Sequence, residues 1–189
     1  MNYYKKINLH CLDLLKDYLF NYVSTSINSL QITRPESNFI NLPTNLLNVI
    51  NTELNSHGIS DIEYCRIYLW PRNSVQLPHV DGVNTILHCA INIPLHGGDK
   101  SIFQWLGGEF EAKSIDLKRV NQKAFSIVWK SDKYVAASVE LKDGCYLIRI
   151  DQPHQAIASA DSDRWLFTMR VKGNPTFEEL YDRLPASDI

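Results

Sequence analysis

The spacing of apolar residues changes once along the chain, from a helical period to a strand period. A first amphipathic helix is predicted from about Asn8 to Val23, because apolar residues recur there every three or four positions. A second helix is predicted to begin at Thr44, whose side chain can cap it, and to end at Gly58. The first sixty residues therefore read as a helical flank.

From residue 62 onward, short β-rich segments follow one another, separated by turn residues such as Gly97-Gly98, Gly107-Gly108 and Asp143-Gly144. Many short strands separated by such turn residues predict a β-sandwich or barrel. Near the end, Thr176 and Glu179 form a capping-box pair that predicts a short C-terminal helix. The predicted strands are Ile62–Trp70, Thr85–Ile93, Ser101–Leu106, Ala124–Trp129, Tyr134–Glu140, Cys145–Ile150 and Arg164–Val171.

Length and composition predict one enzyme-sized domain. The chain has 189 residues with 44% hydrophobic content, enough to bury a substantial core without disulfides or structural metals. We expect a helical flank over 1–60, a β core over 61–172, and a C-terminal helix and tail over 173–189. The net charge of -2 gives no electrostatic reason to expect nucleic acid as a partner.

The four cysteines are widely spaced and mostly lie in apolar runs, which predicts buried free thiols rather than a disulfide framework. No signal-peptide pattern and no apolar run long enough to span a membrane is visible. These observations together predict a cytoplasmic protein.

Candidate chemistry begins with the tripeptide His79-Val80-Asp81. In an extended strand, side chains at i and i+2 leave the same face, so His79 and Asp81 can hold one ion while Val80 points away. His154 follows 75 residues later, and Arg164 ten residues after that. Two imidazoles and a carboxylate, with a nearby guanidinium, are the parts of a mononuclear iron site that handles an anionic co-substrate.

A helix-flanked β-barrel with H-x-D, a distal histidine and an arginine ten residues beyond resembles the Fe(II)- and 2-oxoglutarate-dependent oxygenases. The resemblance covers about Ile62 to Val171 and implies a double-stranded β-helix, or jelly roll. Within that superfamily, Ile86 to Pro94 resembles a strand of aspartyl/asparaginyl β-hydroxylases. Asp81 departs from those enzymes, which typically lack the carboxylate ligand, and is shared with prolyl hydroxylases.

The resemblance implies that His79, Asp81 and His154 bind Fe(II) and that Arg164 binds the distal carboxylate of 2-oxoglutarate. It further implies dioxygen as co-substrate and hydroxylation of a small molecule or a peptidyl side chain. His88 would correspond to a histidine that contacts the co-substrate. Oligomeric state and the identity of the hydroxylated substrate are not indicated.

Several assignments have alternatives. Arg170 shares a strand face with Arg164 and is a rival anchor for the co-substrate. His88 is equally interpreted as a structural histidine, and Tyr68 as a core aromatic rather than a co-substrate contact. Trp105 is interpreted as core packing, with a place at the substrate entrance as the alternative. The charged stretch Glu109 to Lys123 reads as a solvated excursion rather than a substrate-covering loop.

Two other functions remain open at this point. The same polar cluster on a non-catalytic jelly-roll module would bind a redox-inactive metal or an anion. A cupin-type dioxygenase that does not use 2-oxoglutarate would usually require a further histidine and would have no use for Arg164.

Overall fold

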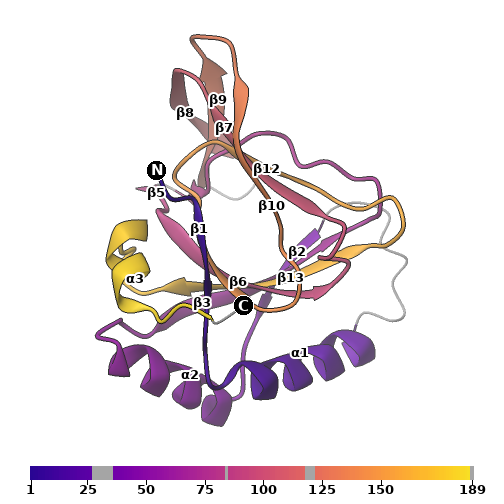
Figure 1. Ribbon diagram of the computed structural model, residues 1–189, viewed down its shortest axis with the longest axis vertical. Coiled ribbons are helices and arrows are strands. Elements are labelled where there is room, and N and C mark those ends of the chain that lie inside the picture. Colours follow the sequence, from indigo (N-terminus) through magenta and orange to yellow (C-terminus); the bar gives the residue numbers. More distant parts are fainter. Residues whose placement is uncertain (27–35, 84, 118–121, 188–189) are drawn as a thin grey trace.

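A computed structural model describes residues 1–26, 36–83, 85–117 and 122–187. Two sheets face each other and helices cover the outer side of the larger one (Figure 1). The larger sheet is antiparallel, with six strands in the order β1-β11-β6-β13-β3-β2. Its strands are β1 (Tyr4–Ile7), β2 (Glu36–Ile40), β3 (Ile62–Trp70), β6 (Cys89–His96), β11 (Cys145–Arg149) and β13 (Arg164–Val171).

The smaller sheet has the order β10-β7-β12, formed by Tyr134–Glu140, Ile102–Gly107 and His154–Ile157. Backbone bridges from Val75 and His79 to β12 extend it by one irregular strand. The two sheets make the jelly roll that the sequence predicts, and the mainly β fold class is confirmed. The remaining elements are β4 (Gly82–Val83), β5 (Thr85–Ile86), β8 (Phe110–Leu117), β9 (Gln122–Trp129), α1 (Leu12–Ser26), α2 (Thr44–Ser56) and α3 (Phe177–Arg183).

Residue alternation on β3 and β13 builds two separate cores. Cys65 and Ile67 on β3 and Phe167 on β13 point toward the helices, where they pack with buried residues of α1, α2 and α3. The residues between them point toward the smaller sheet, where Trp70 packs with Phe103 and other buried residues. The interior face of the larger sheet therefore carries both apolar and polar side chains, and the polar ones form the floor of the site.

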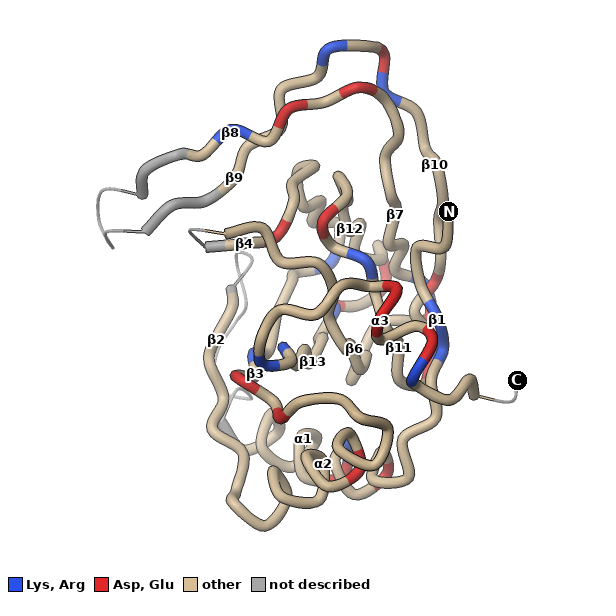
Figure 2. The backbone as a smooth tube through the Cα atoms, turned by 90° about the vertical axis from the view of Figure 1, so that its left-hand side faces the viewer, with Lys and Arg blue, Asp and Glu red and all other residues tan. Residues whose placement is uncertain are grey.

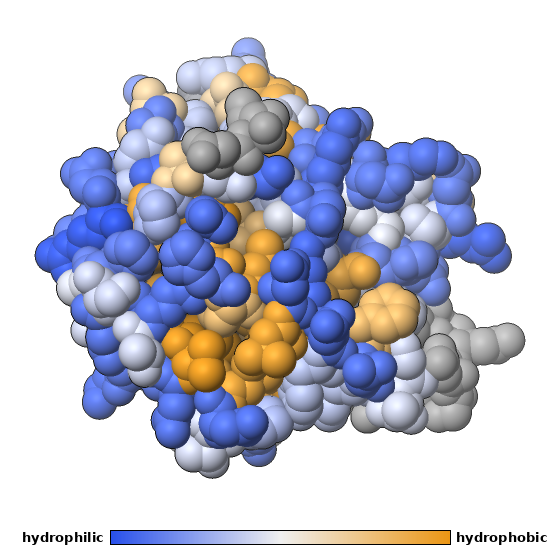
Figure 3. Space-filling model, turned by 60° about the horizontal axis from the view of Figure 1, so that its bottom comes forward, coloured by the Kyte–Doolittle hydropathy of each residue, from blue (hydrophilic) through white to orange (hydrophobic). Residues whose placement is uncertain are grey.

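Helices α1 and α2 lie beneath the larger sheet (Figure 1). The side of the molecule that they form carries a group of apolar side chains surrounded by hydrophilic ones (Figure 3). Leu14 and Val49 are exposed there and border a groove between the two helices. Within the described residues, no helix combines the length and the apolar character needed to cross a bilayer.

Strands β8 and β9 pair as a two-stranded arm that projects from the barrel (Figure 1). The sequence predicted β9 but not β8, because charges interrupt the apolar alternation of β8. Glu111 and Lys113 are exposed, as expected of a solvated segment, while Phe110 and Ala112 on the other face are half-buried. Charges of both signs are distributed over this arm and the following turn (Figure 2). Residues 118–121 of the excursion lie outside the described part of the chain.

Several element boundaries differ from the predictions. The first helix begins at Leu12 rather than Asn8, and Thr44 does not cap the second helix, whose N-cap position is Pro43 without a side-chain hydrogen bond. Gly58, at φ 69°, does follow the second helix as predicted. The short strands β1 and β2 within the helical flank and β12 at His154 were missed, since so few residues give no readable period. The capping box of Thr176 and Glu179 is confirmed.

Candidate metal and co-substrate site

The two candidate histidine ligands are direct partners on neighbouring strands. The backbone amide of His79 donates to the carbonyl of His154 at 3.0 Å, and the reverse bond measures 2.9 Å. Because directly opposite residues in an antiparallel pair share a face, the two rings lie side by side, with centroids 4.4 Å apart. Phe103 stacks on the ring of His154 at 5.2 Å and restricts its orientation. His79 and His154 are thus distant in the sequence but neighbours in the structure.

Both histidines occur in the same local motif, a proline followed by a histidine. Nδ1 of His79 lies 2.8 Å from the carbonyl oxygen of Leu77, two residues earlier. Nδ1 of His154 lies 2.9 Å from the carbonyl oxygen of Gln152, again two residues earlier. A carbonyl can only accept, so Nδ1 carries a proton in each ring, and when the ring is neutral Nε2 has the lone pair that a metal would use. Hydrogen bonds from the outer ring nitrogen to a carbonyl fix the tautomer that a metal requires.

Asp81 completes a cluster whose candidate ligand atoms all lie within 4.8 Å of one another. Its Oδ1 is 3.2 Å from Nε2 of His79 and 3.9 Å from Nε2 of His154. The backbone amide of Asp81 donates to the carbonyl of Ile150 at 3.1 Å, which ties the carboxylate to the end of β11. The tripeptide and the distal histidine therefore converge as the sequence predicts.

Arg170 donates from Nη2 to Oδ2 of Asp81 at 2.7 Å. Burial acts to raise the pKa of Asp81, but the hydrogen bond to His79 and the charge of Arg170 outweigh it and hold that pKa far below its usual value. The carboxylate is thus ionised and has its other oxygen directed toward the two imidazoles. Sequence reasoning identified Arg170 only as a rival co-substrate anchor and missed this contact.

The two imidazoles differ in electrostatic environment. Burial, together with the neighbouring His79, lowers the pKa of His154 to about 4, so this ring is neutral at neutral pH. Burial also acts to lower the pKa of His79, but the hydrogen bond and the charge of Asp81 prevail and raise it. The amide nitrogen of Gln76 lies 2.8 Å from Nε2 of His79 and occupies the position in front of that lone pair. The neutral imidazole of His154, the ionised carboxylate of Asp81 and the imidazole of His79, which Asp81 polarises, thus surround one small volume.

The cluster opens into a cavity between the two sheets. The inner faces of β3, β6 and β13 form one wall, and Phe103 with the histidine pair forms the other. Tyr68 is part of this wall, and burial with the charge of Asp81 raises its pKa. The lining residues are Tyr68, Trp70, Gln76, His79, Asp81, Asn92, Phe103, Ile150, His154, Leu166, Thr168 and Arg170.

Arg164 lies on the same inner face of β13 as Arg170, six residues earlier, or roughly 20 Å along an extended strand. It is 2% exposed, and its guanidinium carbon is 4.7 Å from the ring centroid of Trp70, a lining residue. Its Nη1 is buried and has no hydrogen-bond partner in the part of the chain that the structure describes. Burial lowers the pKa of Arg164 to about 10, which still leaves it protonated at neutral pH. A buried cation without a counter-charge is costly in free energy, and an anionic ligand bound beside it would offset that cost.

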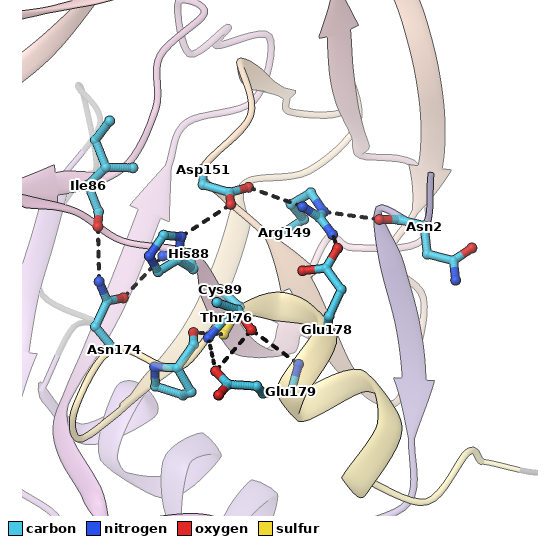
Figure 4. Close-up of polar contacts among 11 residues, drawn as sticks. Asn2, Ile86, His88, Cys89, Arg149, Asp151, Asn174, Thr176, Glu178 and Glu179 are labelled. Atoms are coloured by element: carbon cyan, nitrogen blue, oxygen red, sulfur yellow. Dashed lines mark hydrogen bonds and ion pairs between the residues drawn. The ribbon is translucent and has the colours of Figure 1, made fainter.

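His88 lies elsewhere. The predicted strand Thr85–Ile93 is interrupted, and His88 lies between β5 and β6, with its Nδ1 3.3 Å from Oδ2 of Asp151 (Figure 4). Asp151 is also near Arg149, which pairs with Glu178 on α3. The ring of His88 is absent from the cavity wall. The strand placement was wrong because Asn174, whose side chain binds the amide of His88 and the carbonyl of Ile86, replaces the sheet pairing there.

The other aromatic candidate, Trp105, belongs to the core. It is fully buried, and its Nε1 donates to the carbonyl of Arg149 at 2.8 Å. Strand β9 of the arm lies close to the metal tripeptide. An added Cβ at Gly82, directly after Asp81, would come within 3.0 Å of the Phe125 ring and 2.1 Å of the Thr85 carbonyl oxygen. Glycine at this position therefore lets the arm pack against the metal tripeptide.

No known protein family and no curated protein matches the sequence. Among solved structures, the truncated viral collagen prolyl hydroxylase vCPH of Paramecium bursaria Chlorella virus-1 is similar, with a TM-score of 0.53, 12% identity, and 89% of both chains covered. Its complex with 2OG gives a TM-score of 0.50 and 14% identity, covering 90% of this chain and 95% of that one. At these identities the likeness shows the jelly-roll fold.

Proposed function

We propose that this protein is a non-haem Fe(II), 2-oxoglutarate-dependent oxygenase that hydroxylates an amino acid or a peptidyl side chain. The observation that carries the proposal is the combination of a His-Asp-His cluster with a buried arginine on the inner face of the barrel, whose Nη1 has no hydrogen-bond partner among the described residues. A metal site alone would need no such arginine. The solved prolyl hydroxylases with the same fold support the choice of chemistry.

The residues present fit an iron ion. His79 and His154 present their Nε2 lone pairs and Asp81 presents Oδ1, which is the ligand set of the two-histidine, one-carboxylate sites of non-haem iron oxygenases. Three protein ligands on one side leave room for other ligands on the other side. When bound, iron would supply the redox chemistry that couples decarboxylation of 2-oxoglutarate to hydroxylation of a C–H bond.

Arg164 and Arg170 would each interact with a different carboxylate. Arg164 has a free donor and would bind the distal carboxylate of 2-oxoglutarate through its planar fork. Arg170 already donates to Asp81 and would orient that carboxylate and neutralise it. This division favours Arg164 as the anchor, because its Nη1 donor has no partner among the described residues.

The cavity wall between the two arginines would position the co-substrate chain. Leu166 and Trp70 supply apolar surface, and Thr168 with Asn92 supplies a polar strip, since the Thr168 hydroxyl donates to Oδ1 of Asn92 at 2.5 Å. Tyr68 keeps its hydroxyl protonated, because its pKa is raised, and can donate to a bound carboxylate. We propose this as the role of Tyr68, whereas the position of His88 outside the wall gives no support for a co-substrate contact.

We also propose that residues 1–189 form a single oxygenase domain. All four cysteines are buried and free, which confirms the predicted thiols and supports the proposed cytoplasmic setting.

The test is calorimetric titration of anaerobic protein with 2-oxoglutarate in the presence of Fe(II). Wild type is compared with His79→Ala and Arg164→Ala, and with Arg72→Gln as a control that removes an exposed arginine. Metal-dependent binding that the first two substitutions weaken and the control leaves unchanged is expected. Absence of 2-oxoglutarate binding by folded wild-type protein would reject the oxygenase proposal and favour a non-catalytic jelly-roll module.

A further inference from the structure

A third arginine, Arg66, lies on β3 next to two residues that line the cavity. On β3 the residues Tyr64, Arg66 and Tyr68 share the face that points away from the helical core, and Tyr68 lines the cavity. Arg66 is directly opposite Thr168 in the sheet register, and Thr168 also lines the cavity. The guanidinium therefore extends the polar floor of the site outward, toward the edge of the larger sheet.

Two aromatic rings hold the Arg66 side chain in place. Its guanidinium carbon is 4.0 Å from the ring centroid of Phe39 and 5.6 Å from that of Tyr64. The two rings contact each other edge to face, with centroids 5.7 Å apart. Phe39 lies opposite Arg66 on β2, the outermost strand of the sheet, and is 64% exposed. This set of three residues, the Arg66 shelf, is thus ordered by stacking and open to solvent on one side.

The charge of Arg66 has no acceptor in the described part of the chain. Its Nε is buried without a hydrogen-bond partner, and no described carboxylate forms an ion pair with it. The other two arginines on the inner face have partners in the proposed function, Asp81 for Arg170 and the co-substrate for Arg164. A cation that is oriented, partly desolvated and unpaired beside the reaction cavity remains to be explained.

We propose that the Arg66 shelf binds a carboxylate of the hydroxylated substrate, while Phe39 packs against an apolar part of the same molecule. This inference rests on the proposed oxygenase function and names its substrate class. The neighbouring Arg170 is already paired with Asp81, so the single guanidinium of Arg66 suits a singly charged carboxylate, which it can bind with two parallel hydrogen bonds. The exposed edge of Phe39 leaves space for a ligand larger than the carboxylate itself.

The carboxylate can come from two sources. It is either the α-carboxylate of a free amino acid or small organic acid, or the side chain of an acidic residue in a polypeptide. Both would be recognised by the same guanidinium, so the chemistry of the shelf is common to both. The ligands chosen for the test separate the two sources.

The experiment is ligand-observed NMR on protein loaded with diamagnetic Zn(II) and 2-oxoglutarate, followed by titration of the compounds that bind. One set contains the free amino acids and their carboxamides. The other contains short capped peptides with central Asp or Glu, and matched peptides with Asn or Gln. The variants are Arg66→Gln, Arg66→Lys, which keeps the charge but not the fork, and Arg72→Gln as the exposed control.

Binding of at least one carboxylate compound is expected, together with a loss of at least about tenfold in affinity for its amide and for Arg66→Gln, since a charge-assisted hydrogen bond is lost. Arg66→Lys should retain intermediate affinity, and Arg72→Gln should bind as wild type does. Equal binding of acids and amides, unchanged affinity in a folded Arg66→Gln or Arg66→Lys protein, or no binding by any compound would overturn the assignment. Failure of the wild type to bind 2-oxoglutarate would reject the oxygenase proposal separately, because carboxylate binding can be measured without it.

Discussion

Replacement of Arg164 by methionine tests whether Arg164 anchors the co-substrate, because the substitution should lower co-substrate affinity without lowering the stability of the fold. The guanidinium is buried and contacts Trp70, and among the described residues no carboxylate pairs with it, so its removal leaves none of them without a partner. We therefore expect thermal stability without ligand to be retained or increased, because an uncompensated buried charge is removed. Affinity for 2-oxoglutarate should fall sharply, since the distal carboxylate would lose its only proposed cation.

The magnitude follows from the two hydrogen bonds that a planar fork can make to a carboxylate. At about 1.5 kcal/mol or more for each charged hydrogen bond, the loss is about 3 kcal/mol, or roughly 100-fold in Kd. Anaerobic calorimetry with a bound divalent metal measures Kd, and a thermal melt of the same sample measures stability. A Kd within about twofold of wild type in the Arg164→Met protein would refute the anchor assignment. If Arg170→Met alone abolished co-substrate binding while metal affinity was unchanged, the anchor would be Arg170 instead.

Three further outcomes are expected. His154→Ala should weaken Mn(II) binding by at least about 10-fold, since the loss of even a hydrogen-bond partner of a metal ligand costs about 10- to 100-fold, and a calorimetric titration that shows unchanged affinity would exclude His154 as a ligand. Thr176→Ala should lower the free energy of unfolding by about 1 kcal/mol in urea denaturation, because the α3 capping box is lost, whereas exposed Thr25→Ala should have a smaller effect. The four cysteine thiols should react with a thiol reagent only after denaturation, since burial raises the pKa of Cys65 and Cys89 to about 12, and rapid reaction of the native protein would contradict their burial.

Most of what could be predicted from the sequence about the site and the strands rested on the spacing of the tripeptide and on the side-chain alternation of β3 and β13. Period-two alternation places His79 with Asp81 and Arg164 with Arg170 on common faces regardless of the rest of the fold. The long Ile62–Trp70 and Arg164–Val171 runs gave correct boundaries because nine and eight residues establish a clear period.

The contacts that depend on tertiary pairing were not predictable in this way. The bond from Arg170 to Asp81 joins residues 89 positions apart, and no local pattern indicates it. His88 was misplaced because a side chain from beyond the barrel, that of Asn174, interrupts the strand. The repeated Pro-His dipeptides at His79 and His154 are visible in the sequence and could have indicated the fixed tautomers, had the carbonyl two residues earlier been considered.

The most direct measurement is succinate formation from 2-oxoglutarate by protein supplied with Fe(II) and dioxygen. The proposed function predicts slow turnover even without the hydroxylated substrate, which stops when iron or dioxygen is withheld and is lost in His79→Ala. Folded wild-type protein that binds Fe(II) and 2-oxoglutarate but forms no succinate, with or without the carboxylate ligands identified above, would contradict the oxygenase proposal and indicate a binding module.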